Sequence, residues 1–185
     1  MSETNSSAVV DRARVSSSLL LIAFLVLVLD QVTKGLVYVY LPVIDPTSYW
    51  YPYGGIPVFK DILGIEFSIN HMTNTGAAWG ILGNYQLPLI VLRIGLIFAL
   101  FIYLLYFNHH SSWRLPFILI IAGALGNVID FFLYGHVVDM LHFVLWGYDF
   151  PVFNVADSAI SIGIISLFLL SFFEDSRKNS PEAGS

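Results

Sequence analysis

The chain has 185 residues, of which 57% are hydrophobic and 11% are charged, and its formal net charge is -5. About a quarter of the residues of an ordinary soluble domain are charged, so this composition excludes a soluble single-domain enzyme and a disordered chain. The negative net charge also excludes a nucleic-acid-binding module, which needs a basic surface.

Four apolar stretches are each long enough to cross a bilayer as a helix, because roughly 20 apolar residues span about 30 Å of hydrocarbon. The predicted spans are residues 16–40, 87–107, 115–134 and 155–173. The first stretch has the length of a signal peptide, but Asp-Gln-Val-Thr-Lys follows its apolar part instead of a small-residue cleavage site. We therefore interpret it as a retained membrane anchor.

The basic residues predict the orientation of these spans. Most of the Lys and Arg residues lie at the chain ends or between the second and third spans: Arg12, Arg14, Arg114, Arg177 and Lys178. The positive-inside rule then places both termini in the cytoplasm. We expect residues 1–15 to be a disordered cytoplasmic tail and residues 174–185 to be a second cytoplasmic tail.

Residues 41–86 and 135–154 then face outward. Prolines and glycines between Pro42 and Pro57 exclude a regular helix there, and the aromatic residues among them suit the headgroup layer. From Ile65 onward apolar and polar residues alternate, which indicates a half-buried strand. The predicted fold class is an all-α membrane protein, residues 1–185 forming a single domain of four transmembrane helices with a small extracytoplasmic β-cradle.

Four aspartates lie in or close to the predicted membrane spans, where a charged side chain that faces lipid is unfavourable. A carboxylate at the centre of such a helix costs about 2.5–3.5 kcal/mol. Nevertheless, Asp30, Asp130 and Asp157 lie in or at the ends of spans, and Asp139 lies just beyond one. In the predicted orientation all four lie toward the outer ends of the helices, so the fold brings several acids to one membrane level.

The spacing of three residue pairs also allows a purely structural role. The pairs are Asp30 with Lys34, Asn127 with Asp130, and Asn154 with Asp157. Residues three or four apart share a helix face, so the first pair can form an ion pair and the second a hydrogen-bonded contact between helices. The third pair lies at a helix start, where an amide cap and an acid are both favourable.

The chain contains no cysteine, which excludes disulfide bonds, a catalytic thiolate and cysteine-ligated zinc. It also means that the chain cannot itself be a lipoprotein precursor, whose anchor is built on a cysteine. The histidines have no HExxH or comparable spacing, so we expect neither a metal site nor a cofactor.

Several acids without another nucleophile favour two-carboxylate chemistry. Two aspartates a few ångströms apart share one proton, because ionising both is unfavourable. One carboxylate takes a proton from the water that attacks an amide carbonyl, and the protonated carboxyl donates to the carbonyl oxygen. Composition alone equally allows a proton-coupled transporter or a channel.

Five polar motifs resemble, in order, those of the bacterial lipoprotein signal peptidases (signal peptidase II). They are Asp30-Gln-Val-Thr-Lys34, Asn74-Thr-Gly-Ala-Ala-Trp79, Gly123-Ala-Leu-Gly-Asn127-Val-Ile-Asp130, Gly135-His-Val-Val-Asp139 and Phe153-Asn-Val-Ala-Asp157-Ser-Ala. Together they cover about residues 17–173.

The resemblance implies an intramembrane aspartyl endopeptidase of the bacterial cytoplasmic (inner) membrane, with its active site toward the outer face. Such an enzyme removes the signal peptide from a diacylglyceryl-modified prolipoprotein by cutting before the lipidated cysteine. Its expected partners are these precursors and membrane lipid, not nucleic acid, and we expect a monomer. The strand and loop between the first two spans would cradle the substrate's extended peptide and lipid.

The family match assigns catalysis to Asp139 and Asp157, although spacing alone does not separate Asp139 from Asp130 as the partner of Asp157. By the same match the residues that line or support the site are Asp30, Lys34, Asn74, Gly76, Asn127, Asp130 and Asn154.

Two features depart from the family pattern. Phe131 stands where family members usually carry an arginine, a cation that could pair with Asp130. The Pro- and Tyr-rich insertion 42–57 is also longer than the family pattern predicts. These departures leave open a catalytically lapsed paralogue that binds precursors without cutting them, beside the transporter.

Overall fold

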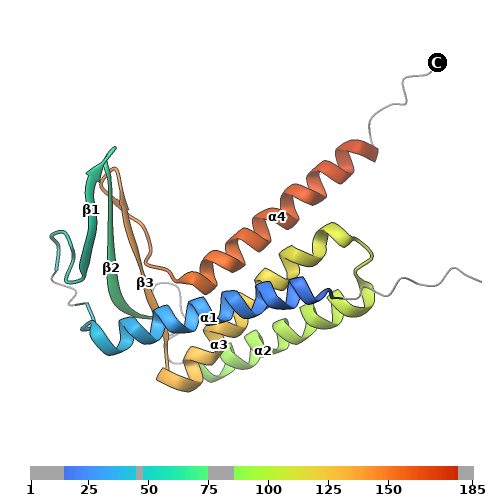
Figure 1. Ribbon diagram of the computed structural model, residues 1–185, viewed down its shortest axis with the longest axis horizontal. Helices are drawn as coiled ribbons and strands as arrows, with labels where there is room; N and C mark the ends of the chain where they lie inside the picture. The colour runs from blue at the N-terminus through green and yellow to red at the C-terminus, as the bar shows by residue number, and fades with distance from the viewer. Residues whose placement is uncertain (1–14, 45–47, 75–85, 179–185) are drawn as a thin grey trace, which may run out of the picture.

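The structure is a computed structural model that describes residues 15–44, 48–74 and 86–178 (Figure 1). Its long helices are α1 (Ser17–Tyr40), α2 (Gln86–Ile102), α3 (Arg114–Tyr134) and α4 (Val155–Lys178). A π-helical turn, η3 (Tyr103–Phe107), continues α2, and a short 3-10 helix, η4 (Ser111–Trp113), precedes α3. The strands are β1 (Ile56–Ile62), β2 (Ile65–Asn74), β3 (Val137–Leu145) and β4 (Tyr148–Asp149). Of the two predicted tails, residues 1–14 and 179–185 lie outside the described residues, whereas residues 174–178 are helical and form the end of α4.

Within the described residues, four helical stretches are long and apolar enough to cross a membrane. They are Ser17–Tyr40, Leu87–Phe107, Ser111–Tyr134 and Val155–Glu174. Large apolar side chains point away from the protein along them, as with Leu20 at 57% exposure and Phe168 at 70%. Surfaces of this kind are stable against lipid and not against water. The prediction of four membrane helices is confirmed.

The description of the fold as all-α is too narrow, because the outward segments form a four-stranded antiparallel sheet in the order β1-β2-β3-β4. Strands β2 and β3 pair from Ile65 opposite Leu145 to Asn74 opposite Val137. Only β2 has an alternating sequence pattern that reveals it. Strand β3 is buried on both faces from Val137 to Met140, so its apolar residues do not alternate with polar ones.

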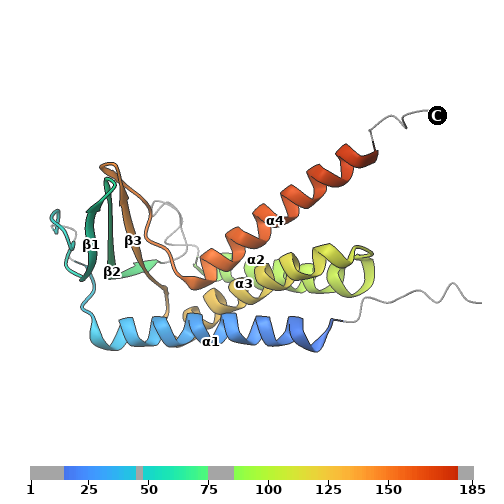
Figure 2. The same ribbon diagram turned by 45° about the horizontal axis from the view of Figure 1, so that its top comes forward.

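The sheet stands at the end of the helix bundle where α1 ends and α4 begins (Figures 1 and 2). Its strands run across the direction of the helices in both views. The helix α3 packs against the other three helices and is the most buried of the four. This arrangement brings the last turns of α1 and α3, the start of β3 and the first turn of α4 to one place.

Two glycines allow the central helix to approach its neighbours closely. A Cβ atom on Gly123 would collide with the backbone oxygen of Ala156 in α4, and a Cβ atom on Gly126 would lie 2.6 Å from Oδ2 of Asp30 in α1. Small residues at helix contacts favour such packing in membranes. The close approach carries the polar side chains of α1, α3 and α4 into contact.

Candidate functional site

A buried ion cluster joins α1 to α3. The ammonium group of Lys34 lies 2.8 Å from Oδ2 of Asp30 and 2.8 Å from Oδ2 of Asp130, and all three side chains are at most 1% exposed. The predicted pairing of Asp30 with Lys34 is therefore present, and Asp130 adds a second carboxylate. A buried charge is tolerated when such partners and hydrogen bonds compensate for its lost hydration. Backbone N–H groups complete the cluster: Ala156 donates to Asp30 and Val138 donates to Asp130.

Gln31 is a further member of this cluster that sequence reasoning missed. Its Nε2 lies within hydrogen-bonding distance of Asp30 Oδ2 at 3.1 Å, Asp130 Oδ1 at 2.9 Å and the Gly126 backbone oxygen at 3.1 Å. Adjacent residues in a helix point in different directions, so nothing in the spacing placed Gln31 beside Asp30. Its position in the motif Asp30-Gln-Val-Thr-Lys34 was the available signal.

Asp139 lies beside this cluster at the start of β3 and is 2% exposed. Asn154 Nδ2 donates to its Oδ1 at 2.6 Å, and Asn74 Nδ2 donates to its Oδ2 at 3.0 Å. The site thus draws on β2, β3 and the segment that precedes α4.

Asp157, in the first turn of α4, is only half-buried. Asn127 Nδ2 donates to its Oδ1 at 2.8 Å, and the backbone N–H of Asn154 donates to its Oδ2 at 3.3 Å. The Asp157 backbone N–H in turn donates to Oδ1 of Asn154 at 2.8 Å, so the two residues cap the helix start reciprocally. The structural role expected for this pair is present, and it leaves Asp157 in contact with the other site residues.

Two asparagines link the carboxylates to the ion cluster. Oδ1 of Asn127 accepts from Lys34 Nζ at 2.9 Å and from Asn154 Nδ2 at 3.2 Å. Since Asn154 also contacts Asp139 and Asn127 also contacts Asp157, both carboxyl groups are fixed by one continuous network. Each amide is oriented by a charged neighbour, which limits the positions that the two carboxyl groups can take.

The environment of Asp139 favours a protonated carboxyl group. Burial, together with the negative charge of Asp157, raises the pKa of Asp139 from 3.8 to about 7. Hydrogen bonds from Asn74 and Asn154 and the charge of Lys34 act in the opposite sense and do not cancel these effects. Asp139 can therefore hold or release a proton near neutral pH, as an acid catalyst must.

The structure brings together all but one of the residues singled out from the sequence. Gly76 lies outside the described residues. Phe131, at the position of the expected arginine, is half-buried and packs edge-on against Phe132 at a centroid distance of 5.8 Å. Asp130 nevertheless has a cationic partner, because Lys34 in α1 contacts it directly.

The comparisons of this chain with protein families and with known proteins identify the same kind of protein. Residues 22–173 match a protein family described as signal peptidase (SPase) II. The chain is 38% identical over 161 residues to the lipoprotein signal peptidase of Staphylococcus carnosus, which covers 86% of this chain and 92% of that protein. It is 34% identical over 164 residues to the lipoprotein signal peptidase of Staphylococcus aureus, covering 88% and 93%.

Two solved structures share the fold, and each is described as a bacterial membrane enzyme determined by the in meso method. The first, at 2.3 Å resolution, has a TM-score of 0.75 and 29% identity, and the match covers 94% of this chain and 98% of that one. The second, at 1.9 Å resolution, has a TM-score of 0.70 and 32% identity, covering 86% and 95%.

Proposed function

Because this chain belongs to the lipoprotein signal peptidase (signal peptidase II) family, we propose that it is an aspartyl endopeptidase acting on diacylglyceryl-modified prolipoproteins. It removes the signal peptide by cutting the bond before the lipidated cysteine. Membership in the family makes the chain a protease, and the four membrane helices make it a multi-pass protein of a bacterial membrane. The observation that carries the aspartyl mechanism is the link from Asp139 through Asn154 to Asp157.

In this mechanism Asp157 is the general base and Asp139 is the general acid. A water molecule attacks the scissile carbonyl carbon while Asp157 takes one of its protons and Asp139 donates its proton to the carbonyl oxygen. The tetrahedral intermediate collapses when the C–N bond breaks: Asp157 gives its proton to the departing amine, and Asp139 takes a proton back from a hydroxyl of the intermediate as the carbonyl re-forms. The products are a free acid on the signal peptide and a free amine on the lipidated cysteine, and no covalent enzyme intermediate forms.

Asp130, the other candidate partner of Asp157, forms contacts with other residues. Asp130 is fully buried and contacts Lys34, Gln31 and the backbone N–H of Val138. These contacts support a positioning role for Asp130 and favour Asp139 as the second catalytic carboxyl. We assign the same positioning role to Asp30, Lys34, Asn127 and Asn154, and we assign Asn74 and Gly76 to the lining of the site.

The face of the sheet that carries Asp139 supports the proposed substrate cradle. Phe143 lies four residues from Asp139 in β3 and therefore on the same face. Its ring stacks on Phe67 at 4.3 Å and on Phe153 at 6.0 Å, and Phe59 follows Phe67 at 5.7 Å. These half-buried rings form an apolar surface that leads from the two carboxyl groups along the sheet, and we propose that the substrate's extended peptide and lipid lie against it.

We propose that the site faces outward from the cytoplasm. Asp139 and Asp157 lie at the end of the bundle where the sheet stands. With both termini in the cytoplasm of a bacterial inner membrane, that end faces outward, where the signal peptide of an exported precursor leaves the bilayer.

A reconstituted cleavage assay tests this function. The purified chain in lipid vesicles is mixed with a synthetic diacylglyceryl-modified precursor, and mass spectrometry identifies the cut bond. We expect cleavage before the lipidated cysteine by the wild type and none by Asp157→Asn. Proton flux across the vesicle membrane without cleavage would instead favour a transporter, and precursor binding without cleavage would favour a lapsed paralogue.

A further inference from the structure

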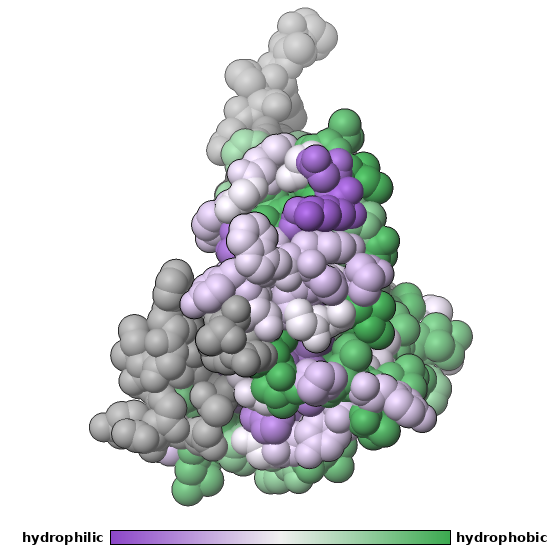
Figure 3. All heavy atoms as spheres, turned by 90° about the vertical axis from the view of Figure 1, so that its left-hand side faces the viewer, coloured by the Kyte–Doolittle hydropathy of each residue, from purple (hydrophilic) through white to green (hydrophobic). Residues whose placement is uncertain are grey.

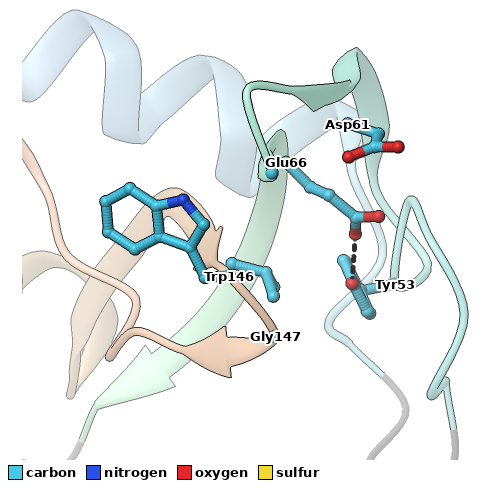
Figure 4. Close-up of a pocket in the computed structure, with 7 residues that line it drawn as sticks. Tyr53, Asp61, Glu66, Trp146 and Gly147 are labelled. Carbon is cyan, nitrogen blue, oxygen red and sulfur yellow. Dashed lines mark hydrogen bonds between the residues drawn. The ribbon is translucent and has the colours of Figure 1, made fainter.

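A hollow of about 420 Å³ lies near the far end of the sheet from Asp139. Its lining residues are Tyr53, Asp61, Gly64, Glu66, Val144, Trp146 and Gly147. Figure 4 shows the Trp146 indole on one side of the hollow and Tyr53, Glu66 and Asp61 on the other. Val144 is paired with Glu66 and is five residues from Asp139, so the hollow opens on the face of the sheet opposite to the proposed catalytic carboxyls.

Both aromatic walls of the hollow are fixed by the protein itself. The Trp146 indole N–H donates to the Leu63 backbone oxygen at 3.1 Å, and its backbone N–H donates to the Gly64 oxygen at 2.8 Å. Gly64 has a φ of +79°, and a Cβ atom there would lie 2.7 Å from the indole, so the glycine is what lets the ring lie flat against the turn. Tyr53 donates to Glu66 at 2.5 Å, and its ring packs on His142 at 4.8 Å.

The side chains that line the hollow include negatively charged groups and no positively charged group. Two of the seven lining residues are acids, Asp61 and Glu66, and none is Lys, Arg or His. Burial, the hydrogen bond to Glu66 and the negative charges of Glu66 and Asp149 together raise the pKa of Tyr53 to about 12. Lys60, the neighbouring cation, lies over the Tyr51 ring at 5.7 Å and does not line the hollow.

Aromatic faces combined with carboxylates are the surroundings that bind an ammonium or guanidinium group. We infer that the hollow binds a lysine or arginine side chain of the substrate polypeptide, in the part that follows the lipidated cysteine. This inference rests on the proposed function. It adds a second contact to substrate recognition, remote from the cut bond.

The geometry favours a peptide over a lipid headgroup as the source of this cation. The face with Phe143 packs on Phe153, in the segment just before α4. The face with the hollow packs on α1 at the start of β3, where Val138 and Met140 cluster with Val37. The hollow itself lies at the other end of the sheet, beside the turns that join β1 to β2 and β3 to β4. Figure 3 shows mainly hydrophilic and intermediate residues over the middle of this end of the molecule.

The position of the basic residue in the substrate can be bounded. Five residues of β3 separate Asp139 from Val144, about 17 Å at about 3.3 Å per residue. Reaching the other face of the sheet lengthens this path, so we expect the basic residue at least about five positions after the cysteine.

The test uses the full-length protein in vesicles and a series of lipidated precursor peptides. The peptides have alanine throughout positions two to twelve after the cysteine, except for one lysine or one glutamate placed at each position in turn. For wild type we expect a KM about three- to tenfold lower with lysine at one or two adjacent positions than with alanine, at unchanged kcat. The advantage should shrink as NaCl is raised, because exposed charges are screened.

Matched variants identify the hollow as the origin of this preference. Glu66→Gln removes the charge and retains an acceptor for Tyr53, and Trp146→Ala removes one aromatic wall; both should abolish the lysine advantage, whereas Trp146→Phe should retain part of it. Trp50→Ala removes an aromatic side chain that is 85% exposed and does not line the hollow, so it should leave the preference unchanged. Glu174→Gln, at the other end of α4, is the control for loss of one negative charge.

Three outcomes would overturn the inference. Equal KM values for lysine, alanine and glutamate at every position would do so, as would a lysine advantage that survives in both Glu66→Gln and Trp146→Ala. The third is a KM that responds to ammonium-bearing lipids through Glu66 while lysine and alanine peptides behave alike, which would assign the hollow to a headgroup.

A different result would contradict the proposed function: no cleavage of the alanine peptide by the wild type. In that case the binding of fluorescent lysine and alanine peptides, measured by anisotropy, still decides whether the hollow selects a cation: equal binding overturns the inference.

Discussion

At the scale of single residues, Asn154 holds the site together, because its side chain contacts Asp139 and Asn127 while its backbone contacts Asp157. The two proposed catalytic carboxyls thus depend on amide groups that carry no charge of their own. Amides orient carboxylates without neutralising them, and this leaves the negative charge of Asp157 free to act on Asp139.

Replacing either proposed catalytic carboxyl tests the dyad. Asp139→Asn and Asp157→Asn retain the size of each side chain but cannot exchange a proton, so we expect cleavage to fall by more than about a hundredfold in each. Cleavage rate on the lipidated precursor and the circular dichroism spectrum are the two readouts. Substantial activity in either folded variant would refute the assignment.

Asp130→Asn distinguishes the two possible partners of Asp157. This change leaves Lys34 with Asp30 as its one carboxylate, so we expect a lower thermal midpoint and a smaller loss of activity than in Asp139→Asn. Differential scanning fluorimetry and the cleavage assay measure the two effects. The reverse order of activities, with an unchanged midpoint, would move the dyad to Asp130 and Asp157.

The pKa of Asp139 gives a pH dependence with a defined sign. Burial and then the charge of Asp157 raise this pKa from 3.8 to about 7, so the folded state binds the proton more tightly than the unfolded state. The resulting contribution to stability is complete below about pH 4 and is lost as the pH rises through about 7. Because the protonated form is the proposed acid, kcat/KM should also fall above about pH 7.

Thermal midpoints and kcat/KM between pH 5 and 9 check this prediction. Asp139→Asn provides the control for stability, since its midpoint should lose the part of the pH dependence that Asp139 supplies. A wild-type rate that rises steadily through this range would contradict the assignment of Asp139 as the acid.

At the scale of secondary-structure elements, small residues decide how closely α3 can approach α4. A methyl group at Gly123 would collide with the α4 backbone at Ala156, whereas Gly95 in α2 has nothing within 4 Å of such a methyl group. We expect Gly123→Ala to destabilise the bundle by about 1–3 kcal/mol and Gly95→Ala to have little effect. Unfolding in detergent followed by circular dichroism measures both, and equal effects would show that the α3–α4 contact can relax.

The helices were predictable from the sequence because hydropathy over about 20 residues is a strong signal. Strand β3 was not, because its buried start lacks alternation, and without β3 the position of Asp139 relative to Asp157 could not be derived. The ion pair of Asp30 with Lys34 follows from helical spacing, whereas the contacts of Gln31 depend on the approach of α3, which is a tertiary feature. The family motifs therefore supplied the expectation for Asp139 that spacing could not supply.

At the scale of the whole molecule, the proposed orientation places the sheet outside and the link between α2 and α3 inside. The chain has no cysteine, so a single introduced cysteine reports its own side of the membrane without further changes. Tyr148→Cys, at a side chain that is 63% exposed in β4, should react with a membrane-impermeant maleimide in right-side-out vesicles. Ser111→Cys, an exposed position in η4, should react only after permeabilisation; the opposite pattern would invert the topology.

The enclosure of Lys34 between carboxylates of two different helices constrains how the protein is made. During translation α1 emerges long before α3, and it can enter the bilayer as a self-neutralised segment because Asp30 and Lys34 sit one turn apart. Asp130 enters the bilayer later, with α3, and has no counter-ion on its own helix turn. Its counter-ion, Lys34, comes within reach when α3 packs on α1. If α3 were inserted but not yet packed on α1, Asp130 would be an uncompensated anion in lipid. The unfavourable energy of this state favours completion of the bundle. The same ion cluster then positions the asparagines of the site.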